Sequence, residues 1–97
     1  MKTVFEPAAR DEFLRTIRWY ATEAGVERAN AFDAEVRRIL TLLQENAALG
    51  SSAKFGLRQF PLRHYPFTIF YRSELNTLRI VAVAHQTRLP NYWTGRV

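Results

Sequence analysis

Apolar side chains recur every three or four residues between Ala8 and Gln44, with one interruption at Gly25. This spacing predicts one helix from about Ala8 to Gly25 and a second from about Glu27 to Gln44, each with one apolar face. Pro7 suits a first helical turn because its missing N–H would have no partner there. Gly25 suits a helix end. The break between the helices is short, so an antiparallel hairpin is the simplest arrangement.

Aromatic and β-branched runs separated by turn residues fill the second half of the chain. Three such runs predict strands: Leu57–Arg63, Phe67–Arg72 and Thr77–Ala84. The turns between them fall at Tyr65-Pro66 and Glu74–Asn76, and connections this short favour an antiparallel meander. A short N-terminal strand, Thr3–Phe5, is expected in the same sheet, because a lone strand leaves its backbone groups unpaired. Asn46–Gly56 is expected to be a loop.

These elements predict an α+β fold of order β-α-α-β-β-β. An N-terminal strand precedes an antiparallel two-helix hairpin that packs on a mainly antiparallel sheet, and a short tail follows Pro90. With 97 residues and no Pro/Gly/Ser-rich linker, residues 1–97 are expected to form a single domain. The residues expected in its core are Phe13, Ile17, Phe32, Val36, Ile39, Leu43, Ile69, Ile80 and Ala82. Trp19 and Tyr20 point in different directions on a helix, so one should be core and the other available to a partner.

Positive charge is concentrated in the second half of the chain. Residues 1–53 hold seven basic and eight acidic side chains, a net charge of −1, whereas residues 54–97 hold seven basic and one acidic, a net charge of +6. This asymmetry indicates a polyanionic target or an acidic protein partner. The arginines expected to line one basic face are Arg58, Arg63, Arg72 and Arg88, with Arg96 added by the tail. The alternative is that such charges only prevent aggregation at an exposed sheet edge.

Composition excludes several kinds of chemistry. The chain has no cysteine, so disulfides, thiolate metal sites and a cysteine nucleophile are impossible. Its two histidines, His64 and His85, have no nearby carboxylate pair, so neither a metal site nor a cofactor is expected. The first residues lack the continuous apolar segment of a signal peptide, and no run approaches the roughly 20 apolar residues that span a bilayer. A soluble, cytoplasmic protein without membrane contact is expected.

The C-terminal half also carries a family resemblance. The run RQFPLRHYPFTIFYR, followed by LRIVAVAHQTR and PNYW, is similar to the RelE/ParE superfamily of bacterial type II toxins and closer to its ParE-like branch. Earlier elements agree in order, with Pro7-Ala8 opening a helix, Trp19-Tyr20 near its end, Gly25 after it, and Gly50 in the loop. The resemblance covers almost the full length of the chain. No single block is diagnostic, and the specificity lies in their combination.

The resemblance implies a toxin held inactive by a cognate antitoxin encoded beside it. One branch of the superfamily cuts mRNA in the ribosomal A site, and the other inhibits DNA gyrase. The antitoxin is expected to bind through an acidic C-terminal segment that is disordered when free, which gives a toxin–antitoxin hetero-oligomer.

Metal-free RNA cleavage requires a base, cations on the phosphate and an acid for the leaving oxygen. The mRNA-cleaving branch supplies them with lysines, arginines and often a terminal tyrosine. Here Thr68 and Gln86 stand where that branch places arginines, and the chain has only two lysines. The catalytic candidates that remain are His85, Arg88 and Tyr92. This incomplete set favours a toxin that acts by binding.

The candidate residues also have structural interpretations. His85 alternates with strand residues and is expected more simply to pack and hydrogen-bond at the sheet's end, while His64 is expected at the surface. Tyr92 and Trp93 either contact a target or anchor the tail. Arg88 and Arg96 either bind the target or pair with an acid on the helices, such as Glu12 or Glu23.

The favoured prediction is therefore a ParE-like toxin that binds an essential target, and DNA gyrase is the first candidate for that target. A ribosome-dependent mRNA interferase and a non-toxic binding module are the alternatives. The target-binding or partner-binding residues expected are Arg58, Arg63, Arg72, Arg88, Tyr92, Trp93 and Arg96.

Overall fold

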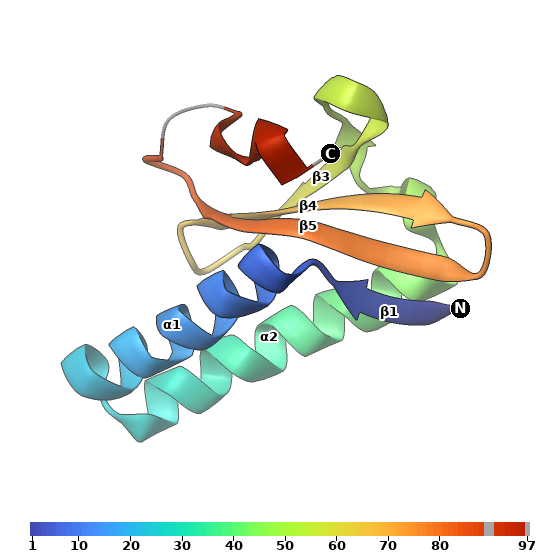
Figure 1. The fold of residues 1–97 in the computed structure, drawn as a ribbon. Coiled ribbons are helices and arrows are strands. Elements are labelled where there is room, and N and C mark those ends of the chain that lie inside the picture. Colours follow the sequence, from blue (N-terminus) through green and yellow to red (C-terminus); the bar gives the residue numbers. More distant parts are fainter. Residues whose placement is uncertain (89–90, 97) are drawn as a thin grey trace.

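Two helices lie on one face of a five-stranded sheet, as the α+β prediction requires (Figure 1). The computed structural model describes residues 1–88 and 91–96; Pro90, after which the tail was expected, lies outside them. The helices are α1 (Pro7–Ala24) and α2 (Val26–Glu45). The strands are β1 (Lys2–Phe5), β2 (Ser51–Ser52), β3 (Arg58–Pro61), β4 (Phe67–Glu74) and β5 (Thr77–His85). Short 3₁₀ turns are η1 (Ala47–Leu49), η2 (Lys54–Gly56) and η3 (Tyr92–Arg96).

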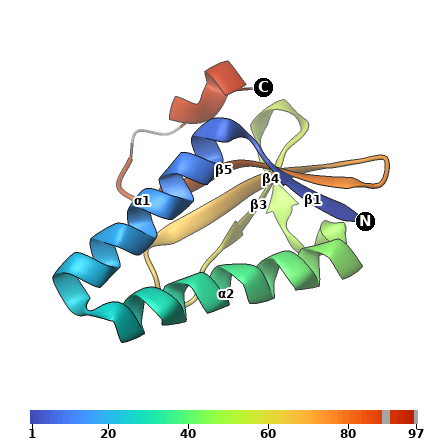
Figure 2. The ribbon, with the colours of Figure 1, turned by 60° about the horizontal axis from the view of Figure 1, so that its bottom comes forward.

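The sheet has the strand order β1-β5-β4-β3-β2. Strands β2 to β5 pair in an antiparallel manner, which confirms the predicted meander. β1 joins the sheet as predicted and pairs in parallel with β5, with Thr3 opposite Leu78. Between β1 and the meander, the chain makes the α1–α2 hairpin, which covers one face of the sheet (Figure 2).

The segment Asn46–Gly56 is not the plain loop expected from its sequence. It contains η1, the two-residue strand β2 and η2. The Tyr71 hydroxyl organises the first part, because it donates to the Ala47 carbonyl oxygen at 2.6 Å and accepts from the Gly50 N–H at 3.0 Å. These contacts place Ser51–Ser52 alongside β3. A phenol distant in sequence therefore helps to order this segment, together with the local cap that the Asn46 side chain gives η1.

The helices and the sheet share a buried core built around Phe32, which is 0% exposed. Most residues expected in the core are buried. Ile17 was placed in the core wrongly, since it is only partly buried at the edge of the cluster. Of the pair on α1, Tyr20 is buried and Trp19 is 58% exposed, which confirms that the two point in different directions.

A second buried cluster covers the opposite face of the sheet. Its centre is Trp93, which lies on η3 and is 1% exposed. The Trp93 ring lies 4.8 Å from that of Phe70, and the cluster also includes Val81 and Ala82. A register shift pairs Phe70 with Ala82 but Tyr71 with Ile80. Val81 is therefore an extra residue that adds apolar surface to this face, and Ala82 is buried beneath the tail rather than beneath the helices.

Among the residues that the structure describes, neither helix is both long and apolar enough to cross a membrane.

Candidate functional site

The carboxylate of Glu12 connects α1, β5 and the C-terminal turn. Glu12 is 6% exposed and is the one charged residue buried in the described part of the chain. It accepts hydrogen bonds from the Val83 N–H at 3.0 Å and from two guanidinium nitrogens of Arg96 at 2.9 and 3.0 Å. The Tyr92 hydroxyl donates to its second oxygen. Such a bidentate, charge-assisted contact is the geometry that carboxylates and guanidiniums favour.

These contacts settle how Arg96 and Trp93 are used in the fold. Arg96 pairs with Glu12, which was one of the two acids expected if the arginine only supports the tail. The pair is largely buried, with Glu12 and Arg96 side chains 5% and 21% exposed, so it differs from the exposed pair that the sequence suggested. Trp93 anchors η3 on the sheet. The tail is therefore fixed from two sides.

Tyr92 is held in its protonated form by its surroundings. Burial, followed by the hydrogen bond to Glu12, raises the pKa of Tyr92 well above its usual range. The hydrogen bond to the same carboxylate raises the pKa of Arg96. Both groups donate to Glu12, and the single hydroxyl proton of Tyr92 is engaged in that contact.

Arg88 lies in the turn that follows β5 and is exposed to solvent. Its guanidinium carbon lies 3.9 Å from the centre of the Tyr92 ring, a cation–π contact. The side chain is exposed, and within residues 1–88 and 91–96 no salt bridge involves it. The Tyr92 ring thus fixes the position of a charge that keeps its hydrogen-bond donors accessible.

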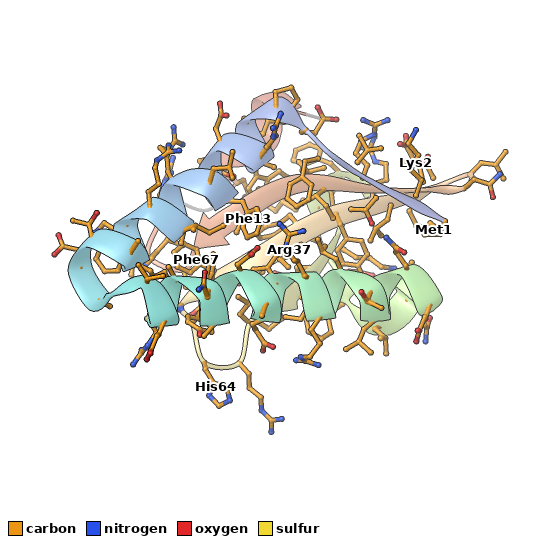
Figure 3. All side chains as sticks on the ribbon, turned by 90° about the horizontal axis from the view of Figure 1, so that it is seen from below. Met1, Lys2, Phe13, Arg37, His64 and Phe67 are labelled. Atoms are coloured by element: carbon orange, nitrogen blue, oxygen red, sulfur yellow. The ribbon has the colours of Figure 1, made fainter. Side chains whose placement is uncertain are left out.

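His85 occupies the packing position expected at the sheet's end. Its ring lies edge-on to Phe67, with ring centres 5.0 Å apart. Its Nδ1 accepts from the Thr87 N–H at 3.1 Å. His64, in contrast, lies in the β3–β4 turn and points away from the protein into solvent (Figure 3).

The arginines of β3 and β4 do not form the single basic face that was expected. Arg58 lies opposite Tyr71 on the face covered by the helices, and it donates to the Gly50 carbonyl oxygen at 2.8 Å. Arg72 follows Tyr71 in β4, so it points to the other face. Arg63 lies in the β3–β4 turn near Glu35 of α2. The pKa of Glu35 is lowered mainly by the hydrogen bond from Arg38, and the charge of Arg63 adds to this effect. The alternation of strand side chains separates these charges.

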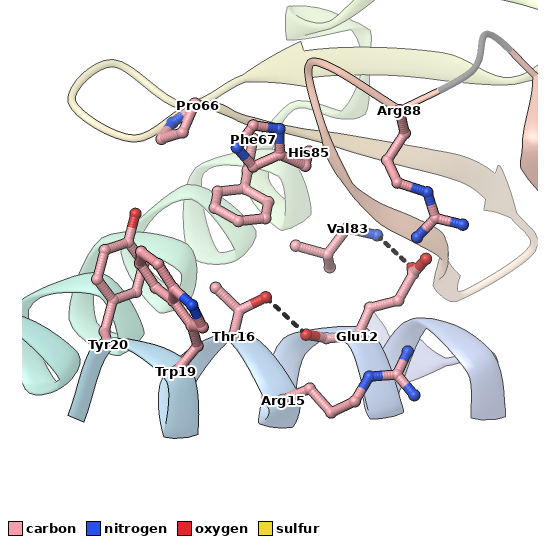
Figure 4. A pocket seen from close by; sticks show the side chains of 10 residues that line it. All are labelled: Glu12, Arg15, Thr16, Trp19, Tyr20, Pro66, Phe67, Val83, His85 and Arg88. Carbon is pink, nitrogen blue, oxygen red and sulfur yellow. Dashed lines mark hydrogen bonds between the residues drawn. The ribbon is translucent and has the colours of Figure 1, made fainter. Parts of the chain in front are cut away.

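A groove of about 470 Å³ lies between α1 and the adjoining ends of β4 and β5 (Figure 4). Trp19, Tyr20 and Phe67 line one end, and Arg15 and Arg88 line the other, on either side of Glu12. The sequence indicated Arg88, and it also predicted that one member of the Trp19-Tyr20 pair would be exposed. It did not indicate Arg15, because the helical spacing marks Arg15 only as a solvent-facing position.

Among the described residues, no cluster of histidine, aspartate and glutamate could hold a metal ion.

Comparisons with known proteins agree with this architecture. Residues 3–90 match the family described as "ParE toxin of type II toxin-antitoxin system, parDE". No curated protein matches the sequence significantly. A solved structure titled "Chromosomal ParDE TA system from P. aeruginosa" has the same fold, with a TM-score of 0.76 and 20% identity over 88% of this chain and 95% of that one. The family match spans most of the sequence, and the chain therefore belongs to the ParE toxin family of type II toxin–antitoxin systems.

Proposed function

We propose that this toxin stops bacterial growth in the cytoplasm by binding DNA gyrase, and that a cognate antitoxin neutralises it. The observation that carries the proposal is the use of Glu12 as a common acceptor for Tyr92 and Arg96. Tyr92, one of the three catalytic candidates, is thus engaged together with Arg96 in holding the tail. This arrangement favours a preorganised binding surface over a set of catalytic groups.

Metal-free RNA cleavage makes demands that the remaining candidates meet poorly. The leaving oxygen needs an acid that releases its proton near neutral pH. Tyr92 has a raised pKa and donates to Glu12, and His85 has only Nε2 left for a substrate, because its Nδ1 contacts Thr87. Arg88 is then the one candidate whose charge is presented to a ligand. A single cation supports recognition better than it supports phosphoryl transfer.

The antitoxin segment has two kinds of surface to bind. An amphipathic helix fits against the α1–α2 hairpin, and an added strand fits an open sheet edge, because β1 and β2 are the edge strands. Acidic residues of the segment are proposed to meet Arg58, Arg63 or Arg72, on the rim of these surfaces. Buried apolar anchors should set the affinity, while rim charges should raise the association rate.

Stopped-flow mixing of toxin and antitoxin can separate the effect of the apolar anchors on affinity from the effect of the rim charges on the association rate. Raising the salt concentration from about 0.05 to about 0.5 M should slow association much more than it speeds dissociation, because salt screens the rim charges. A salt effect carried mostly by the dissociation rate would count against the proposed binding mode.

Expression of the chain alone in a bacterium tests the toxic activity. The proposal predicts growth arrest with intact transcripts, relieved when the product of the adjacent antitoxin gene is expressed as well. Harmless expression of folded protein would instead identify a non-toxic binding module.

One observation favours a second candidate, a ribosome-dependent mRNA interferase. His85, Arg88 and Tyr92 line the same small pocket beside the tail, so the three catalytic candidates lie close together. This function predicts transcripts cut at A-site codons during growth arrest. Mapping transcript ends after induction separates the two functions, because a gyrase-binding toxin leaves those codons intact.

A further inference from the structure

The groove beside α1 exposes an indole ring, that of Trp19, which the core does not bury. Trp19 is 58% exposed on α1, and it lies with Tyr20 and Phe67 at one end of the groove (Figure 4). Indole rings combine a large apolar area with little rotamer entropy, and for this reason they often dominate binding energies at interfaces. The volume of about 470 Å³ falls within the range of about 300–1,000 Å³ typical of ligand pockets. The groove has room for a large side chain.

The other end of the groove is positively charged. Arg15 and Arg88 line it, and the one carboxylate that also lines it is Glu12. Glu12 is already satisfied by Arg96, Tyr92 and the Val83 N–H. The groove therefore presents two guanidinium groups to any ligand, and carboxylates are the complementary groups in proteins.

We propose that this groove is where the toxin's target docks, through an acidic protein segment. The segment inserts one large apolar side chain between Trp19 and Phe67 and places carboxylates against Arg15 and Arg88. This inference rests on the proposed function, because it requires a protein target. It assigns target recognition to α1 as well as to the turn after β5 that carries Arg88.

The distribution of charge favours a protein segment over a nucleic acid. A nucleic acid needs a track of cations that follows its repeated phosphates. Arg58, Arg63 and Arg72 do not line the groove, so its two arginines stand together at one end and an aromatic group stands at the other. This pattern matches one apolar anchor flanked by acids.

Three substitutions in the full chain test the groove. Thr16→Trp fills it without changing charge, because Thr16 lines its α1 wall. Arg15→Glu reverses the charge at one end, and Trp19→Ala removes an exposed ring whose loss the fold should tolerate. Arg10→Glu is the matched control, because Arg10 is an exposed arginine of α1 that does not line the groove. Thermal melting selects the variants that are folded.

Growth arrest after induction and affinity for the purified antitoxin are then measured for each folded variant. For each groove variant, the amount of protein that causes the same growth arrest should rise at least about ten-fold. Arg10→Glu should match the wild type. Antitoxin affinity should stay close to wild type throughout. Folded groove variants that keep full toxicity would reject the groove as the target site but not the proposed function. Variants that lose only antitoxin affinity would have the same consequence.

The wild-type result separates this inference from the function on which it rests. A harmless wild type would overturn both. A toxic wild type whose transcripts are cut, with cutting reduced by the groove variants, would show that the groove binds RNA or the ribosome. That result would also reject an acidic protein segment as its ligand.

Discussion

Arg96 has a structural role at the C-terminal end of the fold. Its guanidinium neutralises the buried Glu12, and its Nη1 also donates to the Val81 carbonyl oxygen at 3.1 Å. Arg96→Ala would leave the Glu12 carboxylate buried with fewer partners. We expect a loss of unfolding free energy of about 1 to 3 kcal/mol, between the values for exposed and for fully buried ion pairs.

Urea unfolding of the purified protein measures this loss. Arg37→Ala is the control, because Arg37 forms an exposed pair with Asp33 and its loss should change stability by about 0 to 1 kcal/mol. Equal stability of the Arg96 and Arg37 variants would contradict the structural role of Arg96.

Arg88 has the opposite character. It is exposed and rests on the Tyr92 ring, so Arg88→Ala should leave thermal melting and antitoxin affinity nearly unchanged. If Arg88 contacts the target, the same substitution should abolish growth arrest. Induction of the variant at wild-type abundance, beside a melting curve, makes the comparison. Full toxicity would leave Arg88 without a functional role.

At the scale of elements, the sequence predicted the helices and the long strands well because their signals are local. Helical periodicity, Pro7 and Gly25 mark the hairpin, and short turns mark the meander. β2 escaped prediction because Ser51-Ser52 carries no strand signal. Its position depends on Tyr71, a residue of β4 that is distant in sequence and joins Ala47 to Gly50.

This long-range connection makes Gly50 a sensitive position. A Cβ at residue 50 would lie 2.7 Å from the Gln59 carbonyl oxygen and closer still to the Tyr71 hydroxyl. Backbone and phenol would both have to move, so Gly50→Ala should destabilise the fold by about 1 to 3 kcal/mol. Gly95→Ala is a suitable control, because a Cβ there meets nothing within 4 Å. Similar urea midpoints for the two variants would argue against tight packing at Gly50.

At the scale of the whole molecule, the sequence indicated that positive charge is concentrated in the C-terminal half. It did not indicate how the fold distributes that charge over the surface. A count of arginines predicts one basic face. In the structure, strand alternation sends Arg58 and Arg72 to opposite faces, and Glu12 neutralises Arg96. The Glu12 contacts join residues about 70 to 84 positions apart, and no local pattern could show that these side chains meet.

The same long-range assembly places Arg15 and Trp19 of α1 in one groove with Arg88, with Trp19 at one end and the two arginines at the other. The surface left for a target is therefore composite, with aromatic side chains from α1 and β4 and cations from α1 and the segment after β5. A toxin that acts by binding needs such a preorganised surface.

Inhibition of purified DNA gyrase tests the central claim most directly. The chain should block supercoiling of a relaxed plasmid when toxin is added in several-fold molar excess over gyrase, and prior addition of the antitoxin should prevent the block. Arg88→Ala and Thr16→Trp should lose inhibition, whereas Arg10→Glu should retain it. Unimpaired supercoiling at that excess, with a preparation that arrests growth in cells, would contradict gyrase as the target.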